Sequence, residues 1–473
     1  MEEKALNLKK FLEVITSENI FVWIIGAIII TFWAVDLWII GLLLICIMIA
    51  GSLFFYKDTS RVLAILFMFV LIISANRHKL GGFSYILFVS IGLLLLGIIT
   101  HLIRFKPKFR HLFTEKKVKG FSLSLLFLCV PAILGGITRK GSNFLVVLVA
   151  FAFFAVIGVC YLFFLATTET KKGEDMLRYV LLIMLVAGIV MSLQIIIYYA
   201  RLGSVDKIIQ CIQTKDLRLG WASNNNVAPF LSLTLPSTFY YAMKKKHYGF
   251  LFIILAFIEY ILIFSTRSRG AIIFTSLAFP FMLCYVMAKS ENKTTNGITI
   301  SLCICLGFLG IALNGENFII AFEKMFETGL DGNGRLSLYQ EAIKTFKEYP
   351  IFGAGWDYRL GEMAGDGYTP YWYHNTVLQV LANMGIFGLI FYVFFFFWRY
   401  YSCLFTKNYR MPKLAIAAGL LLFELYGMVD VNFFGPTFFI SMVIMSFAIE
   451  KSLDSNQCNP YLYTKLINKL KKG

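Results

Sequence analysis

The sequence predicts an all-α, polytopic membrane protein, and three observations support that fold class. Hydrophobic residues make up 59% of the 473-residue chain and charged residues only 15%, whereas an ordinary soluble domain carries about 25% charged residues. Apolar runs recur from one end to the other at roughly the 20-residue length that a helix needs to cross a bilayer. Alternating strand-like segments are missing from the sequence. The composition therefore excludes a soluble multidomain enzyme and a disordered chain.

The apolar runs predict a bundle of about 12–14 transmembrane helices. Only Asp36 separates the first two runs, and the chain shows neither a repeat of fixed period nor a low-complexity linker. We therefore expect residues 1–473 to form a single integral membrane domain. The fourteen candidate segments are 20–35, 37–55, 62–75, 83–103, 121–137, 144–167, 178–199, 226–243, 248–265, 270–288, 297–314, 376–398, 414–430 and 436–450.

The basic residues indicate how the chain is oriented. The net charge is +17, but the lysines and arginines lie in short clusters between apolar runs, which is typical of cytoplasmic loops and not of a nucleic-acid-binding face. The clusters at 104–119 and 244–246 place those loops inside. Both termini are then cytoplasmic, and residues 315–375 form one large extracytoplasmic loop. Residues 451–473 form a basic tail, either an amphipathic helix on the inner leaflet or a frayed end.

The first polar cluster on the predicted outer side is the turn at residues 265–270. It contains Arg267 and Arg269 and is followed by Gly270 at the start of the next apolar helix. Two guanidinium groups beside a helix N-terminus form an anion site suited to a phosphate or diphosphate. The alternative is an interfacial arginine pair bound to lipid phosphates.

The second cluster lies in the outer loop. A turn at residues 331–334 precedes Arg335, and apolar residues then recur at helix spacing until Pro350. This pattern predicts an amphipathic helix over residues 335–348, near the bilayer surface. A cation in the first helical turn is unfavourable unless an anion is present. Arg335 therefore points to an anionic substrate or, alternatively, is simply solvated.

The loop also offers residues suited to binding a sugar. Trp356 follows a glycine-rich turn and is either a sugar platform or ordinary packing, and Tyr373 and Asn375 flank His374 at the start of a span. An imidazole at the membrane surface can accept a proton from a sugar hydroxyl near neutral pH. Asn225, in an asparagine run at 224–226, is either a sugar ligand or a helix cap.

Two acidic residues occupy costly positions near the membrane. Asp430 lies at the outer end of a predicted span, and Glu259 lies about two turns inside the membrane from Arg267. We expect both to pair with the arginine cluster, and a catalytic role is the alternative.

Three stretches together resemble the superfamily of O-antigen ligases and Wzy-type polymerases. They are residues 265–270, residues 334–355 with their Gly-Arg start and Gly-Ala-Gly end, and His374-Asn375-Thr376 through Gly385 and Gly388. The likeness runs from about residue 220 to residue 388. The family's paired arginine motif falls on Arg267 and Arg269, its loop arginine on Arg335 and its loop histidine on His374. Tyr339 stands where many members have tryptophan.

The resemblance implies a polytopic GT-C type glycosyltransferase in the bacterial cytoplasmic (inner) membrane. It would take a glycan from undecaprenyl diphosphate and pass it to a hydroxyl of a glycan or glycolipid acceptor on the extracytoplasmic side. Such enzymes act in cell-surface polysaccharide and lipopolysaccharide biosynthesis. The partners implied are this lipid-linked donor, the acceptor and membrane lipids. No metal, cofactor or nucleotide sugar is expected, because the lipid diphosphate is the leaving group.

The hypothesis assigns each site residue a role. His374, Arg267 and Arg335 would be catalytic, and Arg267, Arg269 and Arg335 would bind the diphosphate. Asn225, Trp356, Tyr373 and Asn375 would bind substrate. The alternatives are a Wzy-type polymerase of lipid-linked repeat units and, from another class, a flippase or transporter of lipid-linked glycan. The enzyme hypothesis requires three guanidinium groups and one imidazole to converge on one external cavity.

Overall fold

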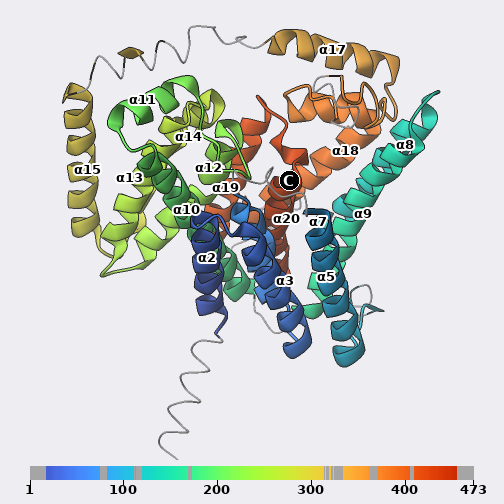
Figure 1. Cartoon of the computed structure of the whole chain (residues 1–473), viewed down its shortest axis with the longest axis horizontal. Helices are drawn as coiled ribbons and strands as arrows, with labels where there is room; N and C mark the ends of the chain where they lie inside the picture. The colour runs from blue at the N-terminus through green and yellow to red at the C-terminus, as the bar shows by residue number, and fades with distance from the viewer. Residues whose placement is uncertain are drawn as a thin grey trace, which may run out of the picture. The chain divides into compact units, whose positions relative to one another are not determined.

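The structure is a computed structural model of the whole chain (Figure 1). The residues it describes are 17–74, 83–110, 112, 120–168, 173–313, 315, 319–320, 323, 334–362, 370–404 and 410–454. Within these ranges the regular elements are α-helices and short 3-10 helices, with no strand, and one isolated bridge joins Arg218 to Ser223. The all-α prediction is confirmed.

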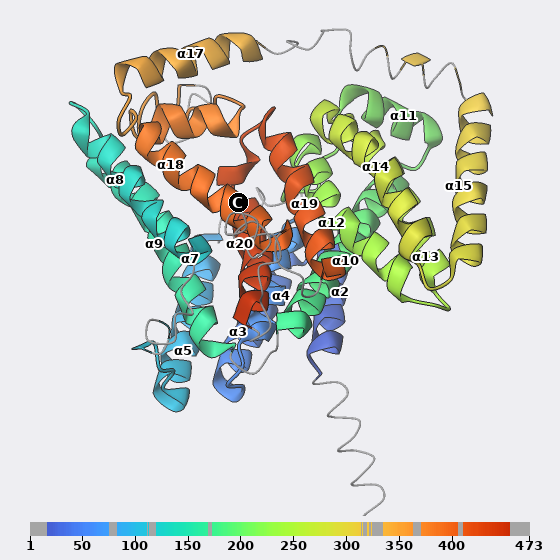
Figure 2. The ribbon, with the colours of Figure 1, turned by 180° about the vertical axis from the view of Figure 1, so that it is seen from behind.

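The chain divides into two compact units, each built from two stretches of sequence. Unit 1 comprises Met1–Pro107 and Thr167–Phe308, and unit 2 comprises Lys108–Ala166 and Leu309–Gly473. Figure 2 shows the ribbon from behind with the same colours. Whether the two units act as the single membrane domain expected from the sequence stays a prediction.

Unit 1 is organised around α10, which packs against α2, α4, α12 and α13. Its helices follow the predicted apolar runs closely, except that α11 lies in a segment where no helix was expected. They are α2 (Glu18–Ala34), α3 (Trp38–Phe55), α4 (Ser60–Met68), η1 (Phe69–Ile72), α5 (Phe83–Phe105), α10 (Gly173–Arg201), α11 (Val205–Thr214), α12 (Asn224–Lys244), α13 (Gly249–Ser265), α14 (Arg269–Lys289) and α15 (Lys293–Leu313), whose last residues belong to unit 2.

Unit 2 is organised around α18, which packs against α7, α8, α17, α19 and α20. The predicted amphipathic helix 335–348 is present with those bounds, whereas the predicted segment 121–137 is divided into two helices at Leu128. The elements are α7 (Gly120–Phe127), α8 (Cys129–Thr138), α9 (Phe144–Thr167), α17 (Arg335–Glu348), α18 (Thr376–Leu404), α19 (Arg410–Gly427), η3 (Asn432–Phe434), α20 (Pro436–Lys451) and η4 (Ser452–Asp454).

Among the described residues, 7 helices are long and apolar enough to cross a membrane, and further apolar helices are shorter. Each of the fourteen candidate segments coincides with helix. The chain is therefore a multi-pass helical membrane protein. The qualifying helices are Trp38–Phe55, Gly120–Thr138, Phe144–Thr167, Gly173–Arg201, Arg269–Lys289, Lys293–Leu313 and Thr376–Leu404.

Helix α18 is interrupted at Gly385, whose φ of 63° and ψ of −164° are not helical. Figure 1 shows the ribbon changing direction within α18. Residues 350–355, which we call the strap, supply the backbone partners that the break removes. Two strap N–H groups donate to the carbonyls of Ala382 and Asn383 at 2.8 and 3.1 Å, and two strap carbonyls accept from Ile386 and Phe387 at 2.9 and 3.1 Å.

Only glycine fits at the break in α18. A Cβ built on Gly385 would lie 2.3 Å from the carbonyl oxygen of Ile351, and the positive φ disfavours any other residue. The break therefore fixes where the first part of α18, residues 376–384, meets the strap.

Parts of three predictions lie outside the described residues. These are the basic tail at 455–473, the residues before 17, and most of 315–333 with 363–369 in the predicted outer loop. The sidedness of the loops and of the termini stays a prediction.

Candidate active site

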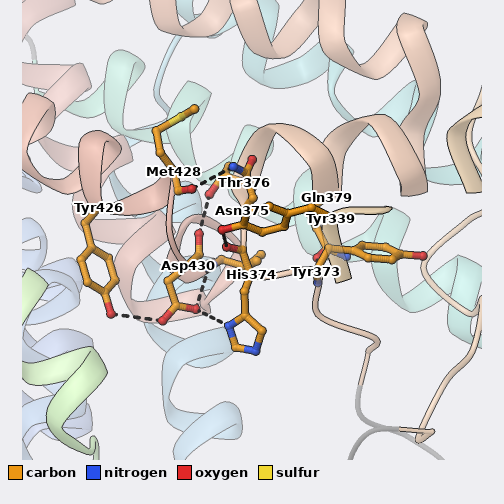
Figure 3. Close-up of polar contacts among 10 residues, drawn as sticks. Tyr339, Tyr373, His374, Asn375, Thr376, Gln379, Tyr426, Met428 and Asp430 are labelled. Carbon is orange, nitrogen blue, oxygen red and sulfur yellow. Dashed lines mark hydrogen bonds and ion pairs between the residues drawn. The ribbon is translucent and has the colours of Figure 1, made fainter. Parts of the chain in front are cut away.

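His374 lies in the turn that leads into α18, and its backbone is in an unusual conformation. Its φ is 51°, in a region that few non-glycine residues occupy and that often marks functional sites. The next residue, Asn375, caps α18: its side-chain oxygen accepts from the Leu378 N–H at 3.0 Å. Its amide donates to the carbonyl of Met428 at 2.8 Å, which ties the turn to the chain after α19 (Figure 3).

The imidazole of His374 is paired with the carboxylate of Asp430. Nδ1 of His374 lies 3.0 Å from Oδ1 of Asp430, and the histidine side chain is 33% exposed while the aspartate side chain is 11% exposed. Because an ionised carboxylate only accepts hydrogen bonds, Nδ1 carries the proton in this pair. The other ring nitrogen, Nε2, points away from the carboxylate (Figure 3) and is an acceptor when the ring is neutral.

Asp430 is held as an anion by its surroundings. Burial acts against ionisation, but the hydrogen bond from His374, the charges of His374 and Arg335 and the Val431 N–H together hold its pKa below the usual range. The Val431 N–H lies 2.8 Å from Oδ1. The hydroxyl of Tyr426 donates to Oδ2 at 3.1 Å. Asp430 therefore pairs with the histidine, and Arg335 acts on it through its charge.

Helix α17 lies against the segment that carries His374, and both ribbon views show it beside α18. The Tyr339 hydroxyl donates to the carbonyl of His374 at 3.3 Å, and Thr345 and Tyr373 share a hydroxyl–hydroxyl bond of 3.1 Å. Beneath them is a small apolar core of Ala342, Tyr371, Tyr373 and Ala382, with Leu338 and Leu378 packed against it. This packing sets the position of Arg335, the first residue of α17.

The arginine turn at 265–270 belongs to unit 1. Arg267 has a φ of 54° and is only 6% exposed, and its guanidinium donates to the carbonyl of Gln213 in α11. Asn224 donates to the carbonyl of Thr266 at 2.7 Å, which holds the turn against the start of α12. Arg269 is half-buried and begins α14. The structure thus builds both predicted arginines into a rigid helix-to-helix turn.

Residues 250–393 match the family model described as O-antigen ligase. This stretch of the chain therefore resembles the O-antigen ligase family. The resemblance expected from the motifs is confirmed over this stretch, which runs from α13 into α18. No curated protein matches the chain.

The stretch that matches this family model contains most of the predicted site residues, but the two units hold different sets. Unit 2 holds His374, Arg335, Tyr373, Asn375 and Trp356, whereas unit 1 holds the other three, which are Arg267, Arg269 and Asn225. The convergence of the two sets on one cavity stays a prediction.

Three of the predicted substrate-binding residues are buried. Trp356 is 6% exposed, with its ring 4.7 Å from that of Phe434. Tyr373 is buried in the core under α17, and burial raises its pKa to about 12 although Thr345 acts in the opposite direction. Asn375 serves as cap and tether. Asn225 is exposed beside Asn224.

The sequence did not predict the partners that position the site. Glu259, expected to pair with the arginines, instead accepts a hydrogen bond from Thr238 at 2.9 Å inside unit 1. Asp430, which the family match does not include, was expected beside the arginines and lies against His374. Gln379 is fully buried and bonds the backbone of Tyr371 and Tyr373 at 2.9 Å each. A polar glutamine one turn into an apolar helix was the only sequence feature that could have indicated this role.

Proposed function

We propose that the chain is a glycosyltransferase that moves a glycan from undecaprenyl diphosphate to a hydroxyl acceptor at the outer face of the bacterial inner membrane. The His374–Asp430 pair carries this proposal. It combines a partly exposed imidazole inside the stretch that matches the O-antigen ligase family, an anionic partner in contact with it and a strained backbone at the start of α18.

On the acceptor side, Nε2 of His374 takes the proton of the acceptor hydroxyl as the oxygen attacks the anomeric carbon. Asp430 stabilises the imidazolium that forms and keeps the ring in the orientation that exposes Nε2. General base catalysis of this kind contributes about 10²–10⁴-fold. The imidazolium then loses its proton to solvent, and the site is ready for another acceptor.

On the donor side, the bond from the anomeric carbon to the diphosphate oxygen breaks, and the lipid diphosphate leaves with the electron pair. Cationic donors lower the barrier because they stabilise charge that develops only during bond cleavage; one such contact is typically worth about 2.7–4 kcal/mol. Arg335 is suited to this role, since it begins the helix that packs against the His374 segment, and its charge helps to lower the pKa of Asp430. From the resemblance we also propose Arg267 and Arg269 as diphosphate-binding residues.

The direct test uses the purified full-length protein in lipid nanodiscs with a defined polyprenyl-diphosphate oligosaccharide. The measurement is release of polyprenyl diphosphate together with the size of the glycan product, with and without a chelator. We expect glycan transfer by the wild-type chain and its loss in His374→Ala. Wild-type protein that gives no product with any supplied acceptor would contradict the proposal.

The same reaction separates the two enzyme alternatives. A ladder of products from the donor alone indicates a Wzy-type polymerase of lipid-linked repeat units. A product that forms only when a second glycan or glycolipid is added indicates a ligase. Donor chemistry is common to both, so His374 and Arg335 are required in either case.

A flippase or transporter of lipid-linked glycan predicts a different cellular outcome. In cells carrying His374→Ala, an enzyme defect leaves unused lipid-linked glycan on the outer leaflet, whereas a flippase defect leaves it on the inner leaflet. Leaflet-selective labelling of the glycan distinguishes them.

A further inference from the structure

Tyr426 lies in the last turn of α19, four residues before Asp430. Its hydroxyl donates to Oδ2 of Asp430 at 3.1 Å, and the residue is 2% exposed. Figure 3 shows the phenol on the opposite side of the carboxylate from the imidazole. The match to the O-antigen ligase family ends at residue 393 and does not include this tyrosine.

The hydrogen bonds to Asp430 show what the tyrosine adds. Oδ1 accepts from Nδ1 of His374 and from the Val431 N–H, at 3.0 and 2.8 Å. Oδ2 accepts from Tyr426. The carboxylate is therefore fixed through both oxygens, and it cannot rotate without breaking a charge-assisted hydrogen bond in a poorly hydrated site.

We propose that Tyr426 is a positioning residue for His374: by fixing Asp430 through Oδ2, it keeps the proton on Nδ1 of His374 and leaves Nε2 as the base. This inference rests on the proposed function for its catalytic consequence. Its structural part, the control of the histidine tautomer, does not depend on turnover.

The first test is spectroscopic and needs no substrate. The chain has only 5 histidines, so ¹⁵N-histidine labelling gives few ring-nitrogen signals in an NMR spectrum. The two signals that disappear in His374→Gln belong to His374. In the wild-type protein at a pH where the ring is neutral, we expect Nδ1 to be protonated. In Tyr426→Phe we expect a mixture of the two tautomers. An unchanged His374 spectrum in that variant would overturn the inference even if glycan transfer is observed.

The second test is kinetic. We expect Tyr426→Phe to lower kcat for glycan transfer by about tenfold, with little change in the KM for the donor lipid, because one hydrogen bond to a charged group is lost away from the substrate. Tyr392→Phe is the matched control: it removes the hydroxyl of another buried tyrosine, whose ring packs 5.1 Å from Phe433. We expect that control to keep wild-type kcat.

A double-variant cycle separates positioning from general packing. If Tyr426 acts through Asp430, then Tyr426→Phe has no further effect on kcat when Asp430→Asn is already present. Multiplicative effects of the two substitutions, or an equal loss in Tyr392→Phe, would show that the phenol only supports the fold. A wild-type protein without transfer activity would contradict the proposed function, and the tautomer measurement would then decide this inference alone.

Discussion

The turn that carries Arg267 and the turn that carries His374 are built alike but hold their side chains differently. Each enters a helix, and each contains one non-glycine residue with positive φ. Each is also tethered by an asparagine amide: Asn224 donates to the carbonyl of Thr266 in the first turn, and Asn375 in the second turn donates to the carbonyl of Met428. Arg267 is 6% exposed and bonded to a carbonyl of α11, whereas the side chain of His374 is 33% exposed, with one ring nitrogen directed away from its partner.

The difference suggests that Arg267 also maintains local structure, whereas His374 is positioned to take part in a reaction. A buried guanidinium bonded to a carbonyl contributes to stability, because its removal leaves that carbonyl without its donor. A half-exposed imidazole fixed through one nitrogen contributes little to stability and keeps the other nitrogen available. The five predictions below test this contrast.

The largest effect is expected for His374. Substitution by alanine lowers the rate of glycan transfer by about 10²–10⁴-fold, because the base that accepts the acceptor proton is lost. The measurement is the transfer assay on protein in nanodiscs, with the thermal unfolding temperature as the control. An unfolding temperature far below that of wild type would mean that His374, too, is a structural residue.

Arg335 is expected to follow. Arg335→Ala lowers transfer by about 10²–10³-fold, the usual cost of removing one electrostatic contact with a developing anion, while Arg335→Lys retains part of the activity because it keeps the charge. The difference between the alanine and lysine variants is measured as kcat at saturating donor concentration. Equal activity of the alanine and lysine variants would rule out a charge-based role.

Arg267→Ala sharpens the contrast most directly. The substitution removes the donor to the Gln213 carbonyl and should lower the free energy of unfolding by about 1–3 kcal/mol. His374→Ala should lower it by less, because the carboxylate of Asp430 keeps its hydrogen bonds from Tyr426 and from the Val431 N–H. Denaturant titration of both variants measures these free energies. Equal losses of unfolding free energy would contradict the contrast between the two turns.

The two tethers are a matched pair with smaller effects. Asn375→Ala removes both a helix cap and the bond to Met428, and should cost about 0.5–2 kcal/mol from the cap alone. Asn224→Ala removes the bond to Thr266 and should cost about 0.5–1.5 kcal/mol. The Asn375 variant should also lower kcat, because Asn375 holds the turn of His374. A fall in kcat for the Asn224 variant as well would support the proposed role of Arg267 at the diphosphate.

The smallest effect concerns pH. The pKa of Asp430 is held below its usual value in the folded chain, so this carboxylate stabilises the fold above that usual value, and the contribution is lost as the pH falls toward the folded-state pKa. We expect the unfolding temperature of the wild type to fall more steeply below about pH 4 than that of Asp430→Asn. Parallel curves for the two proteins would contradict this assignment.

Local sequence patterns predicted the helices well, but they did not predict which distant residues contact each other. The bounds of α17 followed from apolar spacing between a turn and Pro350, both of which act within a few residues. The break at Gly385 could not be predicted in this way, because the residues that form hydrogen bonds with its neighbouring backbone lie about thirty positions earlier, in the strap. The pair His374 and Asp430 is separated by 56 positions and depends on how α18 meets the chain after α19.

The strap has a consequence for how this protein enters the membrane. The ribosome makes residues 350–355 before it makes the break they serve, so the four hydrogen-bonding partners already exist when Gly385 emerges. Beyond the break, residues 386–404 form about 28 Å of helix, close to the thickness of the hydrocarbon layer. Residues 386–404 can therefore insert into the membrane as an ordinary transmembrane helix. We expect the short helix that begins beside His374 to be completed once the backbone of the strap has bonded to it.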